Sequence, residues 1–161
     1  MARDEQPRED LLAEATALVE RIELARPDGA ARVVIGFRRD GAPSIYFGED
    51  AAYHLNAAGQ LRRAYLDGKL FKAERGQLIA IERVRTERQV QLHSHPLDAA
   101  EAAAFVENLV SRAETLAREL DAGAWQVAGQ VPAEGDILSR ARRLLAAVSR
   151  GVTIAASPRV G

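Results

Sequence analysis

The spacing of apolar residues changes along the chain from a helical period to a strand period and back again. From Leu11 to Ile22 the apolar positions recur at helical spacing, and Pro27-Asp28-Gly29 ends this pattern. The pattern predicts a helix over roughly residues 8–25, with Glu14 on its water-facing side.

Residues 31–93 show the pattern of short strands separated by tight turns. Runs rich in β-branched and aromatic residues alternate with glycine-containing turns, such as Asp40-Gly41 and Asp67-Gly68. The segments between these turns are too short for crossover helices, so the strands are expected to be antiparallel. This part of the chain therefore predicts a meander of about six or seven strands.

Helical spacing returns after this meander. Asp98 and Glu101 have the spacing of a capping box, which predicts a long helix that begins there and ends at Gly123. A last helix is expected from about residue 134 to 148. Between these helices, residues 125–129 are expected to form a short strand or a loop. Residues 152–161 are expected to be an edge strand or a frayed tail.

These elements predict an α+β fold in a single domain that comprises residues 1–161, with one helix before the meander and two after it. Pairing across Asp67-Gly68 would leave apolar side chains on both faces of the sheet. We therefore expect helices on one face, and a partner subunit or long basic side chains on the other.

The composition is that of one globular domain with a hydrophobic core. Of the 161 residues, 47% are hydrophobic and 28% are charged, which is outside the range of disordered chains. The absence of cysteine excludes disulfides, thiolate metal sites and cysteine nucleophiles. The first fifteen residues lack the apolar core of a secretory leader, and no apolar run is long enough to cross a bilayer. We expect a cytoplasmic protein that does not associate with membranes.

Basic and aromatic residues are concentrated in the middle of the chain. Residues 30–97 carry eleven basic and seven acidic side chains, although the net charge of the chain is −1, and six of its eight aromatic residues fall within residues 37–71. Aromatic and cationic side chains on one sheet face can hold a single-stranded nucleic acid. The candidate contacts are Arg38, Arg39, Arg62, Arg63, Lys69 and Lys72.

Two of the three histidines lie in the segment His93-Ser94-His95-Pro96. Residues i and i+2 of a strand share a face, so His93 and His95 can converge on one metal ion. His54, in another strand-like segment, is the candidate for a third ligand of a zinc site.

The same four residues resemble the zinc-binding core of the JAMM metalloprotease family. That family uses His-x-His, then seven residues, a serine, and an aspartate three residues later. The resemblance implies a zinc-dependent hydrolase, but Ala103 and Val106 stand where the family has its serine and aspartate. Alternatively, the segment is only a junction at which a strand ends, Pro96 redirects the chain and a helix begins.

The inventory of motifs favours binding over catalysis. The sequence contains neither a P-loop nor a dinucleotide-binding fingerprint, and no catalytic residues are predicted. The leading hypothesis is a small, non-enzymatic binding or scaffolding domain without a cofactor, which self-associates through its sheet or binds another protein. Single-stranded nucleic-acid binding and zinc-dependent hydrolysis are the two alternatives.

Overall fold

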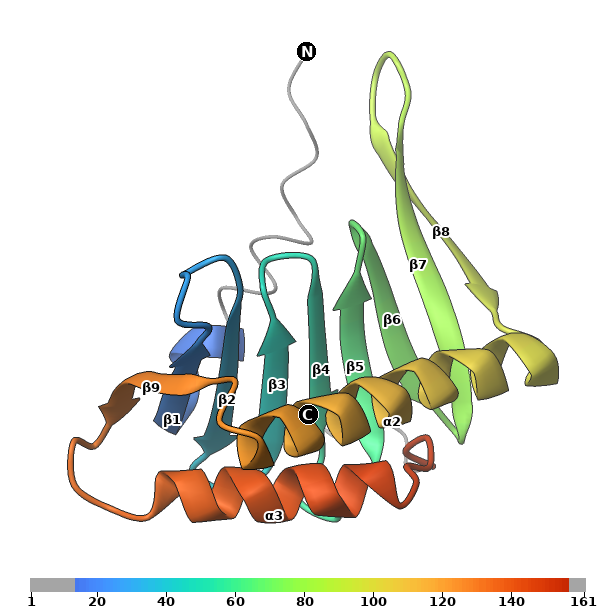
Figure 1. Cartoon of the computed structure of the whole chain (residues 1–161). Helices are drawn as coiled ribbons and strands as arrows, with labels where there is room; N and C mark the ends of the chain where they lie inside the picture. Colours follow the sequence, from blue (N-terminus) through green and yellow to red (C-terminus); the bar gives the residue numbers. More distant parts are fainter. Residues whose placement is uncertain (1–13, 157–161) are drawn as a thin grey trace.

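The computed structural model describes residues 14–156 and shows an antiparallel sheet of nine strands, with two helices packed on one face (Figure 1). The strands are β1 (Leu18–Ala25), β2 (Arg32–Arg38), β3 (Pro43–Phe47), β4 (Ala51–Leu55), β5 (Leu61–Leu66), β6 (Lys69–Glu74), β7 (Gln77–Arg85), β8 (Val90–Pro96) and β9 (Gln126–Val131). The helices are α2 (Ala99–Asp121) and α3 (Ile137–Ser149).

The order of strands in the sheet follows the order in the chain, with one exception. Strands β1 to β8 each pair with the next strand, and β9 returns after α2 to pair with β1. The strands β2 to β8 form the predicted antiparallel meander, which is confirmed. The sheet is larger than predicted because β1 and β9 extend it on one side.

The helix predicted over residues 8–25 is wrong for its second half, which forms β1. Only residues 14–16 are helical, and residues 8–13 lie outside the described part of the chain. In β1, Ile22 pairs with Ile35 and Leu24 with Val33, so its apolar side chains face the core from a strand. Strand β1 lies between β2 and β9 and bonds to both, and this tertiary pairing overrides the helical spacing of its residues.

The helix after the meander is confirmed. Asp98 accepts a hydrogen bond from the Glu101 backbone, and the Glu101 side chain accepts one from the Asp98 backbone, which completes the capping box. The last helix, α3, begins at Ile137, about three residues later than expected. β9 corresponds to the expected short strand, and the final described residues contribute one isolated bridge, between Leu61 and Ile154.

The main core lies between the sheet and the two helices. Helix α2 contributes a buried stripe that includes Phe105 and Leu109, and the ring of Phe105 packs against those of Tyr53 and Phe71.

The sheet face opposite the helices carries a second, smaller cluster. Leu18 folds over Gly36 and packs with Tyr46 and Ala52. A Cβ atom on Gly36 would lie 2.4 Å from Leu18 Cδ1, so only glycine lets Leu18 approach the sheet this closely. Within residues 14–156, no helix has both the length and the apolar character needed to cross a membrane.

Candidate functional site

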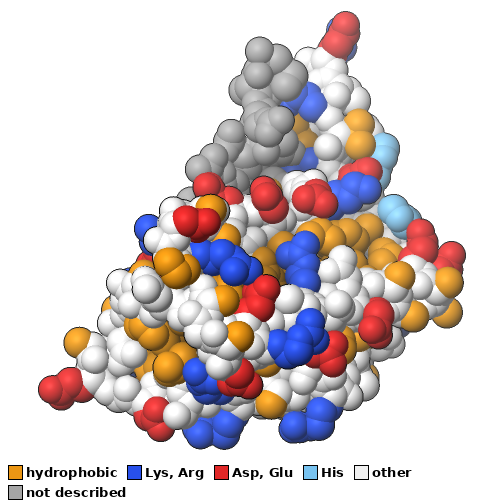
Figure 2. Space-filling model, viewed as in Figure 1, with side chains coloured by type: hydrophobic (Ala, Val, Ile, Leu, Met, Phe, Trp, Pro, Cys, Tyr) orange, Lys and Arg blue, Asp and Glu red, His pale blue; other side chains and the backbone are white. Residues whose placement is uncertain are grey.

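The two histidines of the His-Ser-His segment lie at the surface on the edge strand β8. His93 pairs with Glu82 and His95 with Ala80 across β7, and both side chains are exposed. Histidine side chains are visible along this edge on the helix side of the molecule (Figure 2). Their shared face agrees with the expected strand geometry.

The structure does not bring His54 to these two histidines. His54 lies on β4, four strand spacings from β8, which corresponds to roughly 19 Å. Its register partner is Arg63, on the face opposite the helices, whereas His95 is in register with Ala80 on the helix-covered face. Among the described residues, no three acidic or histidine side chains are grouped so that they could hold a metal ion.

Three of the six predicted nucleic-acid-binding cations instead converge on the carboxylate of Glu14. Arg38 Nη1 and Arg62 Nη2 donate hydrogen bonds to Glu14 Oε1 over 2.6 Å and 2.8 Å. Arg63 Nη1 lies 3.5 Å from the other carboxylate oxygen. The remaining three cations do not join this group: they are Arg39 in the exposed turn after β2, Lys69 at 4.0 Å from Glu82, and Lys72 on β6.

The aromatic residues of the middle segment are divided between the two faces of the sheet. Four of the six pack in the core beneath the helices: Phe37, Phe47, Tyr53 and Phe71. The other two, Tyr46 and Tyr65, belong to the cluster on the opposite face. Only Tyr46 and Tyr65 therefore lie on the face of the arginines, and the other four aromatic rings are not available there to stack on bases.

The group formed by Glu14, Arg38, Arg62, Arg63 and His54 is named here the arginine cluster. Burial alone would raise the pKa of Glu14, but the hydrogen bond from Arg62 and the charges around the carboxylate bring this pKa below its usual value of 4.5. Glu14 is therefore ionised at neutral pH and is the counter-ion of three arginines.

His54 is almost fully buried at the base of this cluster. Its Nδ1 atom forms a hydrogen bond of 2.7 Å with Ser44 Oγ, and Glu14 Oε1 lies 3.8 Å from the same nitrogen. Burial lowers the pKa of His54 to about 4, so the ring is neutral at pH 7.

Ser44, His54 and Glu14 are the residue types of a catalytic triad, but their arrangement differs from one. In a triad, the serine and the carboxylate contact different ring nitrogens, so that the histidine can accept the proton of the serine on one nitrogen while the carboxylate orients the ring through the other. Here both groups approach Nδ1, and Ser44 is completely buried. The arrangement holds the fold together and does not present a nucleophile to a substrate.

The role of Glu14 could not be predicted from the sequence. A predicted helix placed this residue on a water-facing side, and its partners come from β2 and β5, far along the chain. No local signal distinguishes Glu14 from the neighbouring glutamates. Only the sheet register identifies it: the register pairs His54 with Arg63, and the irregularity between this pair and Leu55–Leu61 lets Arg62 reach the same carboxylate.

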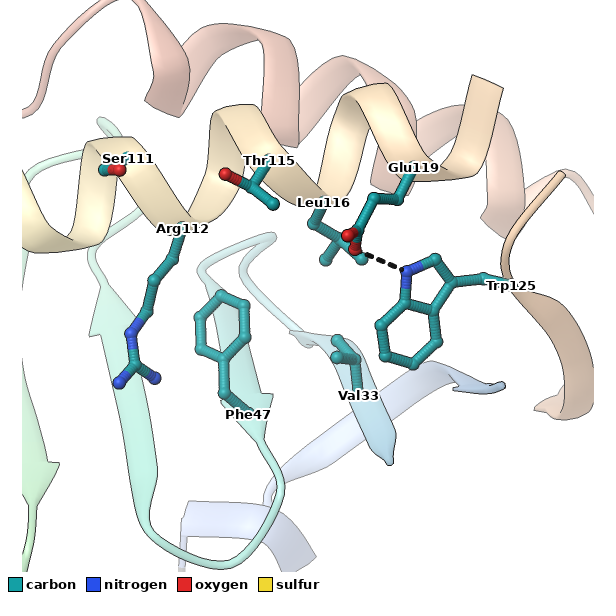
Figure 3. Close-up of a pocket in the computed structure, with 8 residues that line it drawn as sticks. All are labelled: Val33, Phe47, Ser111, Arg112, Thr115, Leu116, Glu119 and Trp125. Carbon is teal, nitrogen blue, oxygen red and sulfur yellow. Dashed lines mark hydrogen bonds between the residues drawn. The ribbon is translucent and has the colours of Figure 1, made fainter. Parts of the chain in front are cut away.

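A groove lies between α2 and the adjacent ends of β2 and β3 (Figure 3). It has a volume of about 270 Å³ and an apolar floor of Val33, Phe47 and Leu116. Trp125 forms one end, where its Nε1 donates a hydrogen bond of 3.1 Å to Glu119 and Arg26 lies 4.7 Å from its ring. The tryptophan ring is therefore held in place before any ligand arrives.

Polar groups of α2 line the other end of this groove. Ser111, Arg112 and Thr115 lie within one helical turn and border the groove (Figure 3). Arg112 Nε donates to Asn108 Oδ1 over 3.1 Å, and the guanidinium carbon lies 5.3 Å from the centre of the Phe47 ring. These two contacts orient the terminal nitrogens of Arg112, which form no ion pair within residues 14–156.

A larger hollow of about 670 Å³ adjoins the groove and shares Val33, Phe47 and Trp125 with it. The loop between β1 and β2 and the turn after β3 form its outer wall, which carries Arg32, Glu49 and Asp50. Glu49 and Asp50 lie in the turn after β3 and line the hollow, whereas Arg112 lines only the groove.

In comparisons with known proteins, no family model, curated protein or solved structure matches this chain. Its function is therefore inferred from the geometry of the molecule.

Proposed function

We propose that the protein is a non-enzymatic binding or scaffolding domain that assembles with a second copy of itself through the edge strand β8. The observation that carries this proposal is that β8 is a fully exposed and regularly paired strand at the edge of the sheet. All seven residues of β8 are exposed, and the strand pairs with β7 without a bulge. The backbone groups on its outer side therefore form a regular row that can accept another strand.

Strand β8 lacks the features with which proteins usually protect a sheet edge. It contains no lysine, arginine, aspartate or glutamate, and its only proline, Pro96, stands at the end. Leu92, with 62% of its surface exposed, lies at its middle. A strand without charges can pair antiparallel with its own copy about a two-fold axis, because no like charges are brought together.

The surface next to this edge supports a second copy as the partner. Leu92 is in register with Arg83 and shares the face that carries the half-buried Ile79 and Ile81. A two-fold axis perpendicular to the sheet keeps equivalent faces on the same side. Pairing would therefore join the apolar surfaces of the two copies and remove part of each from water.

The arrangement of the polar groups supports binding over catalysis. The most densely packed ionisable residues, in the arginine cluster, form contacts with one another, and the adjacent Ser44 is buried. Such groups stabilise a surface and do not act on a substrate.

Substituting Leu92 with glutamate is expected to convert the dimer to a monomer. The change places a charge in the middle of each pairing strand and removes an exposed apolar side chain, while folding should be little affected because Leu92 is exposed. Sedimentation velocity should show wild-type dimers with a dissociation constant on the order of 10 µM. The variant should remain monomeric at about ten times that concentration.

Val127→Glu is the matched control, because Val127 is 47% exposed on β9, the strand at the other edge of the sheet. This variant should still dimerise. In the wild type and in this variant, the β8 amides should exchange hydrogen more slowly as protein concentration rises, because dimerisation pairs this strand. A monomeric wild-type protein at about 100 µM would overturn the proposal. Dissociation caused by Val127→Glu would also overturn it, because the interface would then include β9.

A further inference from the structure

The groove between α2 and the sheet combines an apolar interior with a single oriented cation. Its floor and far end are formed by Val33, Phe47, Leu116 and Trp125, which offer aromatic and aliphatic surface to a ligand. Small-molecule sites are usually mostly apolar, with a few polar groups that fix the orientation of the ligand. The groove has this composition.

The polar end is suited to an anion. Arg112 presents its guanidinium beside Phe47, and the hydroxyl groups of Ser111 and Thr115 border the same space on one turn of α2 (Figure 3). A guanidinium donates two parallel hydrogen bonds to a carboxylate. Because the hydrogen bond to Asn108 engages only Nε, the terminal nitrogens of Arg112 keep their donors for a ligand.

The Trp125 end of the groove does not favour a second charged group on the ligand. The carboxylate of Glu119 already accepts a hydrogen bond from Trp125 and pairs with Arg26 at 3.0 Å. The groove is therefore bounded at this end by an uncharged indole ring and by a carboxylate that is already paired. A ligand that carries its charge at one end and an apolar body at the other matches this distribution.

A buried hydroxyl near Arg112 is consistent with a polar environment at that end. The hydroxyl of Tyr53 is buried without a hydrogen-bond partner within the described part of the chain. Burial raises the pKa of Tyr53, and Arg112 lies close enough for its charge to oppose that increase. The positive charge of Arg112 therefore acts on the buried hydroxyl of Tyr53 as well as on the groove.

From these observations we infer that the groove is a binding site for a small carboxylic acid with an aromatic or branched apolar body. The carboxylate pairs with Arg112, and the apolar body lies over Phe47 and against Trp125. The volume of about 270 Å³ suits a compound of this size and not a long chain. The site is separate from β8, so it does not depend on self-association.

The single tryptophan of the chain makes binding directly measurable. Titration with 3-phenylpropionate should change the fluorescence of Trp125, with a dissociation constant on the order of 1 mM, as expected for so small a ligand. The neutral analogue 3-phenylpropionamide should bind at least about tenfold more weakly, because it cannot form the charged pair with Arg112.

Arg112→Gln should weaken binding of 3-phenylpropionate about tenfold and leave binding of the amide unchanged. Arg118→Gln is the matched control: Arg118 lies on the same helix, is exposed, and pairs with Glu114 outside the groove. It should bind both compounds as the wild type does, and thermal unfolding should verify that both variants are folded. Equal affinity for the acid and the amide, an unaltered affinity in Arg112→Gln, or no fluorescence change up to about 10 mM acid would overturn the inference.

Discussion

The free energy of unfolding is expected to fall by about 3 kcal/mol between pH 7 and pH 4 because His54 is buried in its neutral form. The folded protein holds the pKa of His54 at about 4, whereas an unfolded histidine has a pKa of about 6.5. Between these values the unfolded state binds a proton that the folded state does not. Stability is therefore complete above pH 6.5 and is lost progressively as the pH falls toward 4.

Urea unfolding at a series of pH values tests this expectation. The wild-type protein should lose about 1.2 kcal/mol per pH unit between pH 6 and pH 4.5. His54→Asn keeps a polar partner for Ser44 but cannot be protonated, so most of this slope should disappear. His93→Asn removes an exposed histidine of β8 and should leave the slope intact at protein concentrations well below the dissociation constant of the dimer. An equal slope in the wild type and His54→Asn would show that His54 is not the group responsible.

Replacing Glu14 with glutamine is expected to destabilise the protein by about 3 kcal/mol at pH 7. Glutamine has nearly the same shape, but it leaves Arg38 and Arg62 without the carboxylate that accepts their hydrogen bonds. Removing one member of a largely buried group of charges costs more than the net contribution of the ion pair, because the remaining charges stay desolvated. Chemical denaturation at constant pH measures this loss.

Glu114→Gln provides the comparison for an exposed ion pair. Glu114 lies 3.7 Å from Arg118 on the surface of α2, and both side chains are more than half exposed. Its loss should cost no more than about 0.5 kcal/mol. If Glu14→Gln were as mild as this surface change, the arginine cluster would be a solvated surface group and not a determinant of stability.

The contributions of Glu14 and His54 to stability are lost in different pH ranges. The pKa of Glu14 is lowered, so its contribution to stability is present above pH 4.5 and is lost as the pH falls through the folded pKa. The contribution of His54 is lost at higher pH, between 6.5 and about 4. Measurements above pH 4.5 therefore report mainly on His54.

The arginine cluster changes how the basic middle of the chain is interpreted. From the sequence, Arg38, Arg62 and Arg63 are candidate contacts for nucleic acid, since clusters of cations commonly bind phosphates. In the fold these side chains surround Glu14, which already supplies a negative charge. Nucleic-acid binding at this face would have to compete with a carboxylate of the same chain.

Local patterns in the sequence were sufficient for the meander and for α2. Turns such as Asp67-Gly68 place successive strands side by side, because a tight turn leaves room for no other arrangement. The start of α2 at Asp98 follows from a capping interaction between residues three positions apart. Both features depend on contacts that are short in sequence, and both were predicted correctly.

The tertiary structure decided the features that depend on distant partners. Residues 18–25 have helical spacing but form β1, because β2 and β9 offer hydrogen-bonding partners on both of its sides. Glu14 meets arginines from β2 and β5, and Arg112 reaches Phe47 across the gap between helix and sheet. The local pattern of residues is enough to predict which segments form strands in the meander, where α2 begins, and that both sheet faces carry apolar residues. Which charges are neutralised, which edge stays open and where a groove forms depend on strand register and helix docking, which the local pattern does not encode.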